Sequence, residues 1–212
     1  MAVVIPAINV ESFDEVVRRI RRAERVAKWV HIDVADGTFT QKAVWHNAAD
    51  LSTLQTPLKI EIHFMVSRPE EKIVPWLASS IARILFHLEA THKAAGLINR
   101  CHEAGKEAGV AIRPDTAWEA LKPFAASADV LQTLAVMPGP SGQQFDPHTL
   151  EKISRLRTLA PRGLIEVDGG ISVGIAQECA KAGADLLAAA SSLFDGDIPF
   201  EEAFSKLSHD AA

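Results

Sequence analysis

Trp29-Val30-His31-Ile32-Asp33-Val34 is an apolar run that carries two polar side chains, and it is typical of a buried β-strand. Side chains two positions apart in a strand point the same way, so His31 and Asp33 share a face. A second apolar run, at 59–66, contains His63, and a third, at 163–168, ends in Asp168. If the three strands belong to one parallel barrel, these four side chains converge on a single point.

Short apolar runs alternate with amphipathic helical stretches along the whole chain. We expect strands at 3–10, 29–34, 59–66, 83–89, 109–113, 130–136, 163–168 and 185–190. Helices are expected at 13–27, 93–108, 150–159, 175–182 and 200–207, with a less regular segment at 47–54. This alternation favours an α/β fold, a compact (β/α)8 TIM barrel. An open Rossmann-type sheet is the rival, but no Gly-x-Gly-x-x-Gly turn follows the first strand.

Composition predicts one domain over residues 1–212, because a chain of this length with 48% hydrophobic residues can bury a full core. The net charge of −5 gives no reason to expect nucleic acid or an anionic membrane as partner. The longest apolar runs are too short to span a membrane, and the N-terminus does not resemble a signal peptide. Cys101 and Cys179 are the only cysteines, so we expect a reduced, cytoplasmic protein. The sequence is compatible with a homo-oligomer.

The converging residues predict a metal site, because barrels of this type carry their chemistry at the C-terminal ends of the strands. Two imidazoles and two carboxylates suit one divalent metal ion such as Zn, Fe, Mn or Co. The expected ligands are His31, Asp33, His63 and Asp168. Two carboxylates around one carbon also suit proton transfer, which makes Asp33 and Asp168 the candidate catalytic residues. His87 and Glu89 end another strand, and the sequence leaves open whether they support the site or only pack locally.

Three turns rich in small residues follow the sixth, seventh and eighth strands and predict a phosphate site. Small residues let backbone N–H groups approach an anion, and barrels often bind phosphate after their last two strands. The expected binding residues in these turns are Gly139, Pro140, Ser141, Gly142, Gly169, Gly170, Ala190 and Ser191.

Five short motifs, in order along nearly the whole chain, resemble those of the ribulose-phosphate 3-epimerases. They are HIDVADG (31–37), EIHFMV (61–66), FHLEA (86–90), PGPSGQ (138–143) and EVDGGI (166–171). The resemblance implies an isomerase of the pentose phosphate pathway. Such an enzyme inverts C3 of a ketose phosphate, most simply D-ribulose 5-phosphate to D-xylulose 5-phosphate, through a cis-enediolate. It also implies a bound phosphosugar, contacts from Met65, and the metal and acid/base roles given above.

The departures from the family pattern fall around the substrate rather than the metal. Val10 stands where the family has a substrate-contacting serine, and Arg113 where it usually has asparagine. Further changes are Ala35, Leu134, Met137 and Ala190. Two alternatives therefore remain open, an epimerase for another ketose phosphate such as a hexulose 6-phosphate, and a non-catalytic barrel that binds metal and phosphosugar. A Schiff-base aldolase is disfavoured because no lysine ends a predicted strand.

Overall fold

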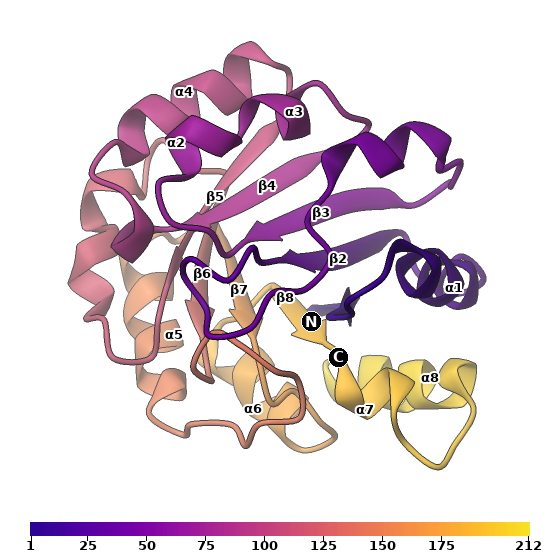
Figure 1. Ribbon diagram of the computed structural model, residues 1–212. Coiled ribbons are helices and arrows are strands. Elements are labelled where there is room, and N and C mark those ends of the chain that lie inside the picture. Colours follow the sequence, from indigo (N-terminus) through magenta and orange to yellow (C-terminus); the bar gives the residue numbers. More distant parts are fainter.

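The computed structural model describes all residues, 1–212, and contains a closed barrel of parallel strands paired in chain order (Figure 1). The strands are β1 (Val3–Ile8), β2 (Trp29–Val34), β3 (Lys59–Phe64), β4 (Arg83–His87), β5 (Glu107–Ile112), β6 (Val130–Leu134), β7 (Leu164–Asp168) and β8 (Leu186–Ala189). The predicted (β/α)8 barrel is confirmed, and pairing between β1 and β8 closes it. No helix in the structure has the length and apolar character needed to cross a membrane.

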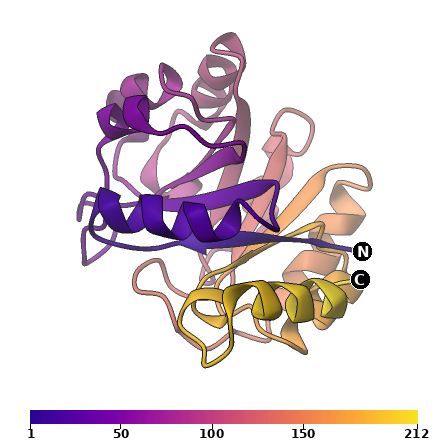
Figure 2. The ribbon, with the colours of Figure 1, turned by 90° about the vertical axis from the view of Figure 1, so that its right-hand side faces the viewer.

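Helices surround the barrel and connect its strands (Figure 1). The α-helices are α1 (Phe13–Ala23), α2 (Pro69–Lys72), α3 (Val74–Leu77), α4 (Ala94–Glu103), α5 (Thr149–Leu159), α6 (Ile175–Ala182), α7 (Ser191–Phe194) and α8 (Phe200–Asp210). The 3₁₀ helices are η1 (Ala48–Thr53), η2 (Leu88–Ala90) and η3 (Trp118–Phe124). Helix α1 lies beside α8 in Figure 2, and near the termini the N–H of Ala2 donates to the carbonyl of Ala211 at 2.8 Å.

The structure corrects the predicted helix at 93–108. Helix α4 ends at Glu103, Gly105 takes a left-handed φ of 70°, and β5 has begun by Glu107. Glycine reaches this φ without a Cβ penalty and commonly ends helices. The sequence pattern typical of a helix therefore extends beyond Gly105, the residue that ends the helix in the structure.

Register places the polar side chains of neighbouring strands next to one another. On β2 and β3, His31 pairs with Glu61 and Asp33 pairs with His63, and Glu61 in turn pairs with Arg83 of β4. Because alternate residues face the barrel axis, these side chains share the interior. The barrel also contains a small apolar cluster: Ile5, Leu85, Val130 and Leu186. The larger apolar core lies between the strands and the helices.

Gly109 of β5 leaves the space that Leu85 fills in this interior cluster. A Cβ at position 109 would lie 2.5 Å from Leu85 Cδ2. We therefore expect Gly109→Ala to lower the free energy of unfolding by about 1–3 kcal/mol through overpacking, as measured by urea denaturation.

The double variant with Leu85→Ala tests this cause, because the smaller side chain removes the clash. Its loss of stability should be clearly less than the sum of the two single losses. Gly96→Ala on the exposed face of α4 is the matched control, since nothing lies within 4 Å of its Cβ. It should gain about 0.5–1 kcal/mol. Additive losses in the double variant would contradict the packing argument.

Candidate metal and proton-transfer site

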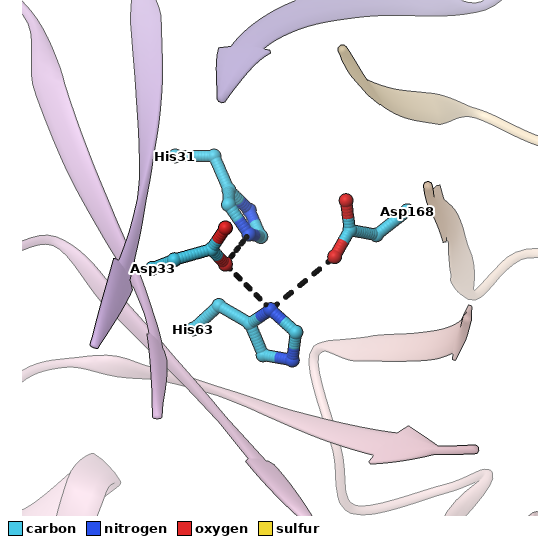
Figure 3. A group of neighbouring side chains, drawn as sticks. All are labelled: His31, Asp33, His63 and Asp168. Atoms are coloured by element: carbon cyan, nitrogen blue, oxygen red, sulfur yellow. Dashed lines mark hydrogen bonds and ion pairs between the residues drawn. The ribbon is translucent and has the colours of Figure 1, made fainter. Parts of the chain in front are cut away.

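Four side chains from three strands converge near the C-terminal end of the barrel (Figure 3). His31 and Asp33 come from β2, His63 from β3, and Asp168 is the last residue of β7. Each offers one ligand atom, and these atoms lie within 4.8 Å of one another. In Figure 3, His63 Nδ1 lies between the two carboxylates, 3.0 Å from Asp33 Oδ1 and 3.3 Å from Asp168 Oδ2.

The ring of His31 is oriented by a carboxylate behind it. Its Nδ1 donates to Glu61 Oε1 at 2.7 Å, so Nε2 points into the site, 3.4 Å from Asp33 Oδ1. Nε2 is fully buried and makes no hydrogen bond. A buried ring nitrogen without a partner, facing two carboxylates and a second imidazole, fits a divalent metal ion.

In the absence of a metal, the carboxylates of the site favour protonation of its two histidines. Burial alone would lower the pKa of His63, but its hydrogen bonds with Asp168 and Asp33 outweigh burial and raise the pKa to about 9. The pKa of His31 is also raised, because its interactions with the carboxylates of Asp33, Glu166 and Glu61 outweigh its burial. Burial would raise the pKa of Asp33, yet both histidines hold it well below its usual range. The pocket therefore favours positive charge between its carboxylates.

A charged layer beneath the site holds His31 in place. Arg83 Nη1 lies 2.6 Å from Glu61 Oε2, and its Nη2 lies 2.6 Å from Glu107 Oε2. Burial, followed by repulsion from Glu61, raises the pKa of Glu166 to about 7. A second group of possible metal ligands consists of His31, Glu61 and Glu166. The positive charge beside these carboxylates is already supplied by the Arg83 guanidinium.

His87 and Glu89, which the sequence left open as supporting or merely packing residues, are connected to the site by hydrogen bonds. His87 Nε2 lies 2.9 Å from His63 Nε2, and His87 Nδ1 lies 3.2 Å from Glu89 Oε2. Burial lowers the pKa of His87 to about 4 despite this carboxylate. Hydrogen bonds from His87, Thr116 and the backbone of Arg113 outweigh burial and lower the pKa of Glu89 to about 2. His87 is therefore neutral and Glu89 is a carboxylate.

One cavity opens above the four side chains, and the predicted substrate residues other than Val10 line it. They are Met65, Gly139, Pro140, Ser141, Gly142, Gly169, Gly170, Ala190 and Ser191, together with the catalytic candidates Asp33 and Asp168. The structure thus brings the glycine- and serine-rich turns and the two carboxylates to the same cavity.

Val10 is not part of this cavity, and Asn9 takes the place expected for it. Asn9 Nδ2 donates to Asp33 Oδ2 at 2.8 Å and to the Gly139 carbonyl at 3.2 Å. Neighbouring residues of an extended chain point to opposite sides, and Val10 lines an adjoining hollow that shares Asn9 and residues 139–141 with the cavity. The expected contact between Val10 and substrate therefore has no support in the structure. Two-residue alternation from Ala7 would have identified Asn9.

The fold and the site together define a barrel enzyme with a candidate divalent-metal centre. Residues 3–194 match the Ribulose-phosphate 3 epimerase family. The chain is 36% identical to the ribulose-phosphate 3-epimerase of Chlamydia muridarum, over 82% of this chain and 79% of that protein. It is 31% identical to the enzyme of the same name from Schizosaccharomyces pombe, over 97% and 92%. The chain belongs to the ribulose-phosphate 3-epimerase family, and it is an isomerase.

Solved structures of more distant sequence share the fold. Orotidine 5'-monophosphate decarboxylase from Sulfolobus solfataricus superposes with a TM-score of 0.68 at 13% identity, covering 100% of this chain and 98% of that one. A tryptophan synthase complex from Pyrococcus furiosus gives 0.69 at 15% identity, covering 96% and 95%. At these identities the likeness concerns the barrel alone.

Arg83 should contribute strongly to stability, because it is the buried cation facing Glu61 and Glu166. We expect Arg83→Met to cost about 3–5 kcal/mol at pH 8, measured by urea denaturation, since it leaves buried carboxylates unpaired. The loss should be smaller at pH 6. The Arg83 guanidinium lowers the pKa of Glu166, so its removal raises that pKa further and lets the variant neutralise Glu166 by taking up a proton at pH 6.

Arg155→Met is the matched control, because Arg155 and its partner Glu151 are both exposed. Its effect should be at most about 1 kcal/mol at either pH. An equal loss from both variants would contradict the role assigned to the buried cation.

Proposed function

We propose that this protein is a metal-dependent epimerase that inverts C3 of a ketose phosphate, with D-ribulose 5-phosphate and D-xylulose 5-phosphate as its pair of substrates. The observation that carries the proposal is the placement of Asp33 and Asp168 on two sides of His63, at the floor of the cavity lined by the small-residue turns. Membership of the epimerase family supports the same reaction.

His31, Asp33, His63 and Asp168 would hold the metal ion, which would be Zn, Fe, Mn or Co. Their mixed nitrogen and oxygen atoms suit any of these, and the unpartnered Nε2 of His31 is available as a ligand. When bound, such an ion polarises the substrate ketone and makes the neighbouring C–H proton more acidic.

The two aspartates would carry the proton transfers. One carboxylate removes the C3 proton from one face of the sugar, which leaves an enediolate. The other, protonated at the start, donates its proton to C3 from the opposite face, and the centre is inverted. The roles exchange in the reverse direction. Asn9 supports this chemistry by fixing one oxygen of Asp33 through its 2.8 Å hydrogen bond.

The phosphate would lie against the small-residue turns at the other side of the cavity. Gly170 has a φ of 67°, and a Cβ there would lie 2.6 Å from the backbone nitrogen of Phe145. Only glycine therefore fits this position. Gly139 and Gly142 also have positive φ values, which bend the 137–143 loop over the cavity.

A substrate panel tests the proposal directly. Purified protein, loaded with each candidate metal, is incubated in deuterated water with pentulose and hexulose phosphates. We expect deuterium to enter C3 of D-ribulose 5-phosphate, as followed by NMR. Preferential exchange with a hexulose 6-phosphate would assign the other ketose phosphate, and no exchange with any member would favour the non-catalytic barrel.

Asp168→Asn should abolish interconversion of the two epimers, and C3 exchange should survive with at most one of them, because only Asp33 is left to move the proton. Binding of the phosphate end, measured with inorganic phosphate, should remain. Metal content is measured in parallel, since Asp168 is also a proposed ligand. Asp195→Asn, at an exposed pair with Arg19, is the control and should exchange at the wild-type rate. An Asp168→Asn protein that keeps its metal and still interconverts the epimers would rule out the acid/base role.

Metal affinity should rise steeply with pH. The pKa of His63 is about 9, so below that pH a bound ion must displace a proton from its ring, and the raised pKa of His31 acts in the same direction. Affinity should therefore increase at least about tenfold per pH unit between pH 6 and pH 8. Titration with Zn²⁺ in several buffers measures this slope, and a pH-independent affinity would contradict binding by these two imidazoles.

A further inference from the structure

His87 and Glu89 form a chain of hydrogen bonds that leads away from the proposed metal site. The two Nε2 atoms of His63 and His87 lie 2.9 Å apart, close enough for one hydrogen bond with a single proton between them. One ring must donate and the other accept. The direction of this bond decides which nitrogen of His63 carries its proton, and so whether Nδ1 can offer a lone pair to a metal.

Glu89 settles that direction, because its carboxylate can only accept. Its Oε1 receives the backbone N–H of Arg113 at 2.9 Å and also the hydroxyl of Thr116. Its Oε2 faces His87 Nδ1, which must therefore be the protonated nitrogen of His87. His63 Nδ1 points between two carboxylates, Asp33 and Asp168, whereas His87 faces only Glu89. The proton between the two rings therefore belongs to His63 Nε2, and His87 Nε2 accepts it.

The surroundings leave His87 no other partner. The side chain is fully buried, and the Phe39 ring covers it with a centroid distance of 4.7 Å. No exposed side-chain surface remains through which water could take the place of either hydrogen bond. Both ring nitrogens of His87 are therefore occupied, Nδ1 by Glu89 and Nε2 by His63.

We propose that Glu89, acting through His87, is a positioning residue that keeps the proton of His63 on Nε2 and presents Nδ1 as a ligand. The inference rests on the proposed metal site, and neither Glu89 nor His87 touches the ion or the substrate. It explains why a buried histidine of β4 and a partly buried glutamate of η2 lie beside a ligand of β3.

Glu89→Gln tests this with almost no change of shape. The carbonyl oxygen of the new side chain must face the backbone N–H of Arg113, which can only donate. Its NH₂ group is then directed at His87 Nδ1, so His87 must accept there and carry its proton on Nε2. That proton points at His63 Nε2 and moves the proton of His63 to Nδ1, where the metal would bind. We expect affinity for Zn²⁺ to fall at least about tenfold.

Thr116→Val is the matched control. It removes a donor from the other oxygen of Glu89 and leaves the oxygen that faces His87 unchanged. This variant should retain the wild-type affinity for Zn²⁺. If Glu89→Gln folds, by its thermal transition, and binds Zn²⁺ as tightly as the wild type, the proposal is overturned.

The position of the proton on His87 provides a test that needs no variant. Nitrogen-15 NMR of the wild-type protein, with and without Zn²⁺, distinguishes Nδ1–H from Nε2–H, and we expect Nδ1–H in both states. A proton on Nε2 overturns the inference whether or not metal binds. Failure of the wild type to bind any divalent ion would instead count against the proposed metal site, so the two failures are distinguishable.

Discussion

The constraint on which the rest of the structure depends is the burial of charge inside the barrel. Glu61, Glu166, Asp33 and Asp168 bring carboxyl groups into a space from which water is nearly excluded. Buried carboxylates are costly unless they are paired, and each of these faces a cation or an imidazole inside the barrel. At the lower level that partner is Arg83, and at the upper level it is a pair of imidazoles. A proton or a metal ion can supply the upper charge, but only a fixed guanidinium supplies the lower one.

Strand register places these buried charged groups close enough together to form the site. The pairing of β2 with β3 sets His31 beside Glu61 and Asp33 beside His63, and the pairing of β3 with β4 sets Glu61 beside Arg83. A shift of one residue in either pair would turn every one of these side chains to the other face. The same hydrogen bonds that hold the barrel closed therefore also hold the ligand geometry, so fold and function share one set of contacts.

Much of this could be predicted from the sequence, because it depends on local pattern. Alternating apolar strands and helices identified the barrel, and two-residue spacing with the strand-end rule brought His31, Asp33, His63 and Asp168 together. The contacts of Asn9, Arg83 and His87 could not be predicted, since they join strands whose register and tilt no local pattern specifies. Val10 was expected at the substrate from a motif position alone. In the structure it is Asn9, the residue after the end of β1, that lines the cavity, and Val10 lines the adjoining hollow.

Hydrogen-bond direction separates the two histidines that would hold the metal. His31 presents Nε2 because a carboxylate accepts directly from its Nδ1. His63 is oriented the other way. Its Nδ1 faces the centre of the site, and its Nε2 contacts the imidazole of His87 rather than a carboxylate. An imidazole nitrogen can donate or accept a hydrogen bond, so His87 by itself does not fix the direction of its hydrogen bond with His63. The anion that sets this direction stands one residue further away, at Glu89, where backbone and hydroxyl donors keep it ionised. In this proposal Glu89, which contacts neither the metal nor the substrate, determines which nitrogen of His63 is free to bind the metal.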